Sequence, residues 1–171
     1  MKHLVLVMLA ACSNAADPAV DAFVGPRMSD GALDAALDAP PGTAMRILVL
    51  NEVAPSETPD WFEVVNATTA VVQLADFAYV DLAGDFAKAK TFPTMTLAPG
   101  VRYVQNVDDV TSGFKLASDE ELWIYRVSDH ALSDGVDWPE GAAPAGKAYA
   151  RSPDVFGPFV TAAQTRGTAN P

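Results

Sequence analysis

The pattern of hydrophobic positions divides the chain into three parts. Residues 4–11 form an uninterrupted apolar run, whereas residues 12–45 carry scattered apolar residues among Ala, Asp, Pro and Gly. From Arg46 onward, short apolar stretches recur at close intervals between polar turns. This division predicts an N-terminal targeting segment, a flexible linker over residues 12–45 and one folded domain over residues 46–171.

The folded part has the period of β-strands. In "DWFEVVN", Phe62 and Val64 share one face and Trp61 lies on the other. Short runs with turn sequences between them favour an all-β fold, an antiparallel sandwich or barrel, with residues 86–90 as the one brief stretch that could be helical. Strands are predicted at residues 46–53, 60–66, 71–74, 77–82, 89–92, 101–107 and 121–127.

The apolar run "LVLVMLAA" follows a short positive start and precedes the single cysteine of the chain. As a helix it would span on the order of 12 Å, far less than the roughly 30 Å hydrocarbon core of a membrane. It therefore predicts a signal peptide over residues 1–11 and no transmembrane helix. The tetrapeptide "LAAC", which ends at Cys12, resembles the lipobox of bacterial lipoproteins.

The lipobox resemblance implies that Cys12 becomes the first residue of the mature protein and carries lipid. Two or three acyl chains together hold a protein stably on a membrane. Ser13 stands where an Asp would be the usual signal for inner-membrane retention, so the resemblance favours the outer membrane. Residues 12–45 would form a disordered tether with a reach of roughly 30 Å. The alternative is an unprocessed cytosolic N-terminus in which Cys12 is a plain thiol.

Charge and composition narrow the possible chemistry. The chain has 22 acidic and 11 basic residues and a net charge of -11, which disfavours nucleic acid as a partner. One cysteine and two histidines cannot form a disulfide or a zinc or copper cluster. His130 lies in a polar turn without a nucleophile motif nearby, so we expect no enzyme, although a pair of hydrolytic carboxylates stays open.

Six segments, in order, resemble the lamin-tail domain, a module of nuclear lamins and of many bacterial extracytoplasmic proteins. "LNEV" resembles Ile-Asn-Glu-Ile, and "DWFEVVN" resembles Asp-Trp-Ile-Glu-Leu-Tyr-Asn. The stretches "QLADFAYVD", "FPTMTLAPGVRYV", "FKLASDEELWIYR" and "YARSPDVFGPFV" with "TRGTANP" follow in the family's sequence. Ala75, Phe77 and Arg166 depart from the family's Gly, Trp and Pro. The matching motif residues are Asn51, Glu52, Asp60, Trp61, Glu63 and Asn66.

The lamin-tail resemblance implies an immunoglobulin-like antiparallel β-sandwich over residues 46–171 and a role in interaction or tethering. With the lipobox, it leads us to expect a non-catalytic lipoprotein of the cell envelope that binds an unidentified envelope protein or a glycan. The alternatives are an accessory subunit of an envelope hydrolase and a calcium-dependent carbohydrate-binding module. No cofactor is expected unless calcium binds.

Two sets of residues are candidates for a site. The motif carboxylates and amides are the ligand type that calcium takes, but they lack the spacing of a calcium loop. We interpret them as structural, with carboxylates on a solvated strand face and asparagines that bond turn amides. The aromatic set is either core or a partly exposed partner surface. This set consists of Trp61, Trp123, Tyr125 and Trp138.

Replacing the proposed lipid attachment residue tests the anchor. Cys12→Ser should release the protein from membranes without unfolding it, because the anchor and the predicted core are separate. Fractionation of host cells, with circular dichroism of the released protein, measures both effects. The intact mass of the wild-type protein should begin at Cys12 and include a diacylglycerol and an acyl chain. An unmodified chain that begins at Met1 would contradict the anchor.

Overall fold

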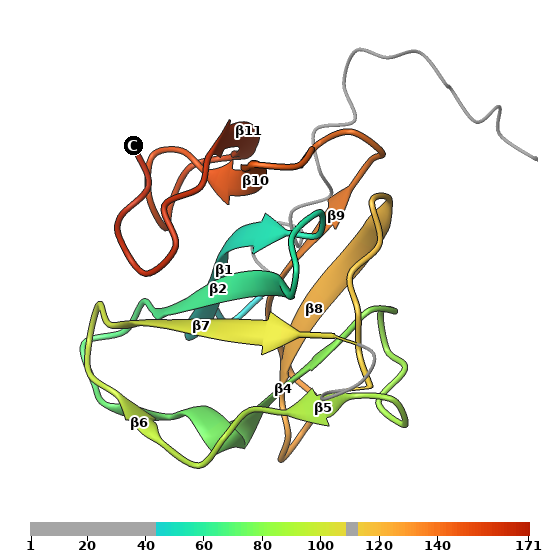
Figure 1. Cartoon of the computed structure of the whole chain (residues 1–171). Helices are drawn as coiled ribbons and strands as arrows, with labels where there is room; N and C mark the ends of the chain where they lie inside the picture. The colour runs from blue at the N-terminus through green and yellow to red at the C-terminus, as the bar shows by residue number, and fades with distance from the viewer. Residues whose placement is uncertain (1–43, 109–112) are drawn as a thin grey trace, which may run out of the picture. The chain divides into compact units, whose positions relative to one another are not determined.

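Figure 1 shows the computed structural model, which describes residues 44–108 and 113–171. The predicted signal peptide, Cys12 and nearly all of the predicted tether lie outside the described residues. All of the described residues belong to one compact unit. Their regular elements are β-strands and one short 3₁₀ turn, η1 (Leu74–Asp76), which confirms the all-β prediction. No helix in these residues is long and apolar enough to cross a membrane.

The strands pair antiparallel in two larger sheets and one small pair (Figure 1). The five-stranded sheet has the order β11 (Phe159–Ala163), β10 (Lys147–Arg151), β1 (Leu48–Ala54), β2 (Asp60–Asn66), β7 (Arg102–Val107). The four-stranded sheet has the order β5 (Lys90–Thr91), β4 (Phe77–Val80), β8 (Glu120–Arg126), β9 (Leu132–Trp138). The small pair is β3 (Val72–Gln73) with β6 (Thr96–Leu97).

The core lies between the inner faces of the two larger sheets. Phe62 and Val64 of β2 belong to it, whereas Trp61 packs in a separate cluster, as the alternation of "DWFEVVN" predicts. The ring of Phe62 meets that of Tyr79 on β4 edge to face, with centroids 5.0 Å apart. Such aromatic pairs add to the free energy gained by burying apolar surface. The arrangement is compatible with a β-sandwich.

Several elements differ from the sequence prediction. Residues 86–90 form a turn that leads into β5 and no helix, so the suggested helix is wrong. The strands β6, β9, β10 and β11 were not predicted, and β9 is the most informative of them because its sequence, "LSDGVDW", is largely polar. Ser133 and Asp134 are nevertheless fully buried in β9. Their burial is possible because their side chains form hydrogen bonds with the backbone of β1.

Side chains of β9 join the two sheets along one edge. Ser133 Oγ accepts a hydrogen bond from Leu48 N and donates one to Leu48 O, both at 2.9 Å. Asp134 Oδ2 accepts from Leu50 N at 2.9 Å. Just before β1, the amides of Met45 and Arg46 donate to carbonyls of β9 at 2.8 Å. The chain therefore pairs briefly with one sheet before it enters the other.

Arg151 of β10 completes this junction. Its side chain is 1 % exposed and donates to Asp134 at 3.1 Å, to Leu50 O at 2.8 Å and to Gly157 O at 3.0 Å. Its guanidinium group also lies over the ring of Phe159, 4.5 Å from the centroid. A buried charge needs such partners, since an unpaired one is strongly destabilising.

Separating the buried pair by mutation should show strong coupling. Arg151→Met leaves the Asp134 carboxylate buried without its main cation and should lower the free energy of unfolding by about 3–5 kcal/mol. The double variant with Asp134→Asn should lose less than the sum of the two single losses, because each substitution removes the same interaction. Urea denaturation measures all four proteins. Losses that add within about 0.5 kcal/mol would contradict the coupling.

Candidate functional site

The six motif residues are all buried, which corrects the interpretation of solvated carboxylates. Glu52 and Glu63 are 0 % exposed, although they lie on the outer face of the five-stranded sheet. The C-terminal segment, residues 164–171, covers that face and bonds to them. The complete set is Asn51, Glu52, Asp60, Trp61, Glu63 and Asn66.

Glu52 and Glu63 hold the C-terminal segment through its backbone. Glu52 accepts from Thr165 N at 2.9 Å and from Thr165 Oγ1 at 2.8 Å. Glu63 accepts from Gly167 N at 2.7 Å and from Asn51 Nδ2 at 2.9 Å, and its carboxylate lies 3.3 Å from Arg102 Nε. Burial, the largest cause, raises the pKa of both carboxyl groups, and these hydrogen bonds oppose the rise.

Asn51 connects two segments that follow it by more than a hundred residues. Its Oδ1 accepts from Val155 N at 2.9 Å, and its Nδ2 donates to Asp154 Oδ1 at 3.0 Å. Asn170 Nδ2 in turn donates to Asn51 O at 3.1 Å and to Arg151 O at 2.9 Å. Asn51 thus fastens both the 152–158 loop and the C-terminal segment to β1.

The other polar motif residues act at separate places. Asp60 accepts from Leu116 N at 3.2 Å, while Asn66 Nδ2 donates to Ala70 O at 2.8 Å and to Leu97 O at 2.9 Å. The motif residues therefore form no single site. Across residues 44–108 and 113–171, no group of three or more His, Cys, Asp or Glu side chains is placed to hold a metal ion.

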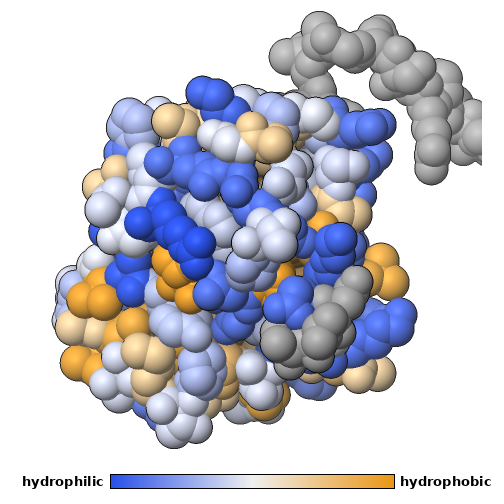
Figure 2. Space-filling model, in the orientation of Figure 1, coloured by the Kyte–Doolittle hydropathy of each residue, from blue (hydrophilic) through white to orange (hydrophobic). Residues whose placement is uncertain are grey.

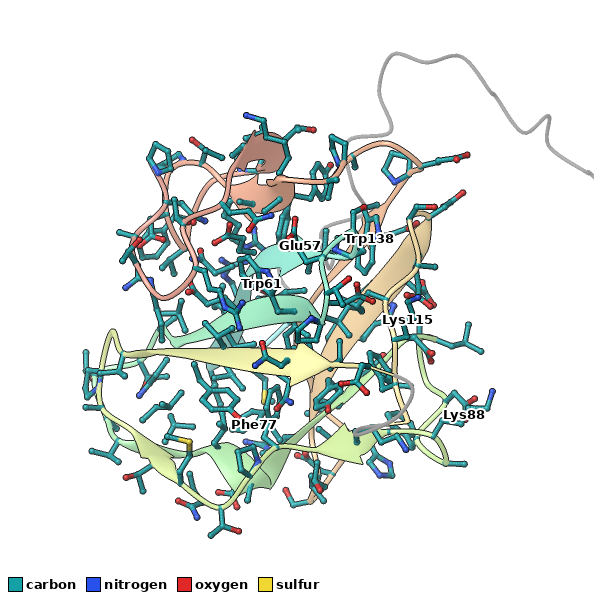
Figure 3. The ribbon with its side chains drawn as sticks, viewed as in Figure 1. Glu57, Trp61, Phe77, Lys88, Lys115 and Trp138 are labelled. Atoms are coloured by element: carbon teal, nitrogen blue, oxygen red, sulfur yellow. The ribbon has the colours of Figure 1, made fainter. Side chains whose placement is uncertain are left out.

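Two of the four candidate aromatic residues are buried. Trp61, labelled in Figure 3, is 1 % exposed, and the guanidinium carbon of Arg166 lies 5.3 Å from its ring centroid. Trp138 is 0 % exposed, and its Nε1 donates to Ala117 O at 3.1 Å. Of the two interpretations left open for the aromatic set, core packing is the one that the burial of Trp61 and Trp138 fits.

Trp123 and Tyr125 lie half-buried on the outer face of β8, where the alternation places them. The Trp123 ring lies flat over Gly135 of β9, where an added Cβ would overlap it. Residues 81–89, which include Lys88 (Figure 3), return over this face, and Ala83 N donates to Glu121 Oε1 at 2.7 Å. The backbone of Gly84 bonds the Tyr125 hydroxyl group.

The loop brings further rings to Tyr125. Phe86 meets Tyr125 edge to face at 5.0 Å and stacks on His130 at 3.9 Å, with 10° between the planes. His130 has a left-handed φ of 55°. From the sequence, His130 was considered only as a catalytic residue, and no signal pointed to Phe86, because loop residues have no periodic pattern. Phe86 and His130 lie in segments that are far apart in the sequence, and only the tertiary fold brings their rings together.

These residues surround a hollow of about 120 Å³, here called the aromatic pocket. At its rim, Arg126 is engaged by Asp129 through two hydrogen bonds, of 3.0 and 2.6 Å, and this pairing lowers the pKa of Asp129 to about 2. The guanidinium charge is therefore neutralised locally. The pocket is lined by Ala78, Phe86, Ala89, Thr91, Tyr125, Arg126, Val127 and His130.

The exposed surface elsewhere is mainly hydrophilic on the face drawn in Figure 2, with apolar atoms in separate patches. Large hydrophobic residues that are exposed include Val71 and Phe156, neither of which lines the aromatic pocket. The pocket differs from these patches because it is a hollow whose lining includes the stacked rings of Phe86 and His130.

Comparison of the chain with protein-family models, curated proteins and solved structures finds no match. The structure shows an all-β domain of antiparallel sheets packed together. No family is identified by these comparisons, and the resemblance to the lamin-tail family rests on the sequence motifs.

The raised pKa of Glu52 predicts a pH-dependent difference between two proteins. The folded protein binds a proton at Glu52 more readily than the unfolded chain, so the contribution of this group to stability is present at low pH and is lost as the pH rises through the folded pKa. Glu52→Gln keeps an oxygen for Thr165 N and does not titrate. The free energy of unfolding of Glu52→Gln minus that of the wild type should therefore increase as the pH is raised from about 4 to 8.

Urea denaturation across that pH range measures the difference. Glu140→Gln, at an exposed position, is the matched control and should follow the wild type. A Glu52→Gln difference that stays constant, or that falls as the pH rises, would show that burial does not raise the pKa of Glu52.

Proposed function

We propose that this protein is a lipid-anchored, non-catalytic binding protein of the bacterial cell envelope. In this proposal its folded domain holds a protein partner through the aromatic pocket. The observation that carries the proposal is the group of rings around that pocket, where Phe86, Tyr125 and His130 present their faces and edges beside a hollow of about 120 Å³.

The size and lining of the aromatic pocket favour one planar ring as its occupant. A cavity of about 150 Å³ with an apolar lining binds benzene, so this pocket suits a single six-membered ring. Aromatic faces and edges attract a further ring in stacked or edge-to-face geometry. Ala78, Ala89 and Val127 supply apolar walls, and Arg126 donates to Asp129 through Nε and Nη2. This chemistry favours an aromatic side chain of a protein over a glycan.

Membership of the lamin-tail family is part of the proposal. It is supported by the order of the six sequence segments and by the all-β antiparallel fold. The family-motif residues also have a coherent structural role, because Asn51, Glu52 and Glu63 fasten the C-terminal segment to the sheet. This role explains why residues of these types stand at these positions in an immunoglobulin-like domain of this kind.

The cellular address in this proposal comes from the N-terminal sequence. The lipobox ending at Cys12 would place the lipid on the first mature residue, and Ser13 favours the outer membrane. The net charge of -11 disfavours nucleic acid and anionic lipid head groups as ligands of the domain. A partner protein of the envelope is therefore the occupant that best fits both the address and the pocket.

Binding of a single ring tests the aromatic pocket directly. Residues 13–171, which retain every described strand, should bind N-acetyl-phenylalaninamide with a dissociation constant on the order of 1 mM, as expected for one ring. Saturable chemical-shift changes in NMR spectra measure the affinity. Tyr125→Ala removes one wall and should weaken binding about tenfold or more, a loss of roughly 1.4 kcal/mol.

Val71→Ala is the matched control, because Val71 is 63 % exposed and does not line the aromatic pocket. This variant should bind the probe as the wild type does. Equal binding by Tyr125→Ala and the wild type, or no binding by the wild type, would rule out the aromatic pocket as the site.

A further inference from the structure

Phe156 is the most exposed large hydrophobic residue in the part of the chain that the structure describes, at 81 %. It lies in the 152–158 loop, between β10 and β11. An isolated exposed apolar residue needs no explanation by itself. The conformation of this loop, however, is unusual and is held by several buried groups.

The backbone around Phe156 is held in a costly conformation. Val155 has a φ of 66°, which is strongly disfavoured for a β-branched residue. Its N–H donates to Asn51 Oδ1 at 2.9 Å, and its carbonyl accepts from Arg46 Nη2 at 2.8 Å. Gly157 has no room for a side chain, since an added Cβ would overlap the carbonyl group of Ser152.

Ion pairs and hydrogen bonds on both sides of Phe156 fix the loop further. Asp154 pairs with Arg102 of β7, and Gly157 O accepts from Arg151 Nη1 at 3.0 Å. Phe156 is therefore presented by a rigid loop. A side chain presented in this way loses little conformational entropy on binding, and Phe is enriched in protein interfaces.

Phe156 and the aromatic pocket lie on the outer faces of different sheets. Val155, next to Phe156, packs against Val49 and Val65, which form a cluster separate from the core between the sheets. The aromatic pocket lies over β4 and β8, on the outer side of the four-stranded sheet. Within one molecule the two features are separated by the core, so only a second molecule can bring them together.

We infer that the aromatic pocket takes the Phe156 ring of a second copy of this chain. This inference rests on the binding role proposed for the pocket and names its partner. The phenyl group has the size and the flat shape that the pocket accepts, and Phe86, Tyr125 and His130 offer it edge-to-face and stacked contacts. The rigid loop and the preformed pocket reduce the ordering cost on both sides.

The contact between copies is heterologous, because the Phe156 ring and the aromatic pocket lie over different sheets, so each chain gives its ring to one neighbour and its pocket to another. Such contacts generate closed rings or open filaments. Each copy is strongly acidic, so mutual repulsion weakens the contact at low ionic strength and added salt strengthens it. A shared membrane would raise the effective concentration of tethered copies.

Complementation between two variants tests this inference. Phe156→Ala removes the ring, and His130→Asp places a carboxylate in the aromatic pocket while Asp tolerates the left-handed backbone there. Sedimentation equilibrium of residues 13–171 should show concentration-dependent assembly of the wild type. Each variant alone should stay monomeric, with its dissociation constant raised at least tenfold. An equimolar mixture should form a 1:1 dimer and stop there, since it contains one intact ring and one intact pocket.

Val71→Ala, which changes another exposed apolar residue, should assemble as the wild type does, and circular dichroism checks that each variant is folded. Assembly of Phe156→Ala equal to that of the wild type would overturn the inference. A wild type that stays monomeric at about 1 mM but still binds N-acetyl-phenylalaninamide would overturn it and leave the proposed binding role intact. Binding of phosphatidylglycerol vesicles by the wild type and not by Phe156→Ala would overturn the inference and assign Phe156 to a membrane contact.

Discussion

The requirement that buried polar groups be paired determines how this domain is assembled around β1. Leaving such groups without partners costs free energy that apolar packing does not return. Asn51 therefore binds both the 152–158 loop and the C-terminal segment, and Arg151 with Asp134 joins the sheets at one edge. The outer face of the five-stranded sheet is covered through directed hydrogen bonds, whereas the inner faces meet through apolar contacts.

The same network places the exposed features. The Val155 conformation is possible because Asn51 and Arg46 satisfy its backbone groups, and Phe156 is presented as a result. On the other sheet, the turn at His130 and the loop that carries Phe86 assemble the aromatic pocket beside β8. In both places a rigid sheet positions short loops, which is the usual division between scaffold and binding residues.

The strands with alternating or continuous apolar residues could be predicted from the sequence, because period and burial are local properties. Phe62 and Val64 illustrate this success. Local pattern could not predict β9, where Ser133 is buried by bonds to a strand 85 residues away. Likewise, Glu52 resembles a solvated carboxylate until the segment that covers it, 113 residues later, is in place. Alternation placed Trp61 on the face opposite Phe62 and Val64, but only the tertiary fold decides that this face is covered by the C-terminal segment.

The pairing of Met45 and Arg46 with β9 has a mechanical consequence. A pull from the N-terminal side first loads these two backbone bonds and the contact between Arg46 and Asp134, because they precede β1 in the chain. β1 itself lies between β10 and β2 and bears tension only after that short segment has peeled away. Resistance to force is governed by the rate of unfolding. The junction with β9 can therefore absorb a small extension while the central sheet stays intact.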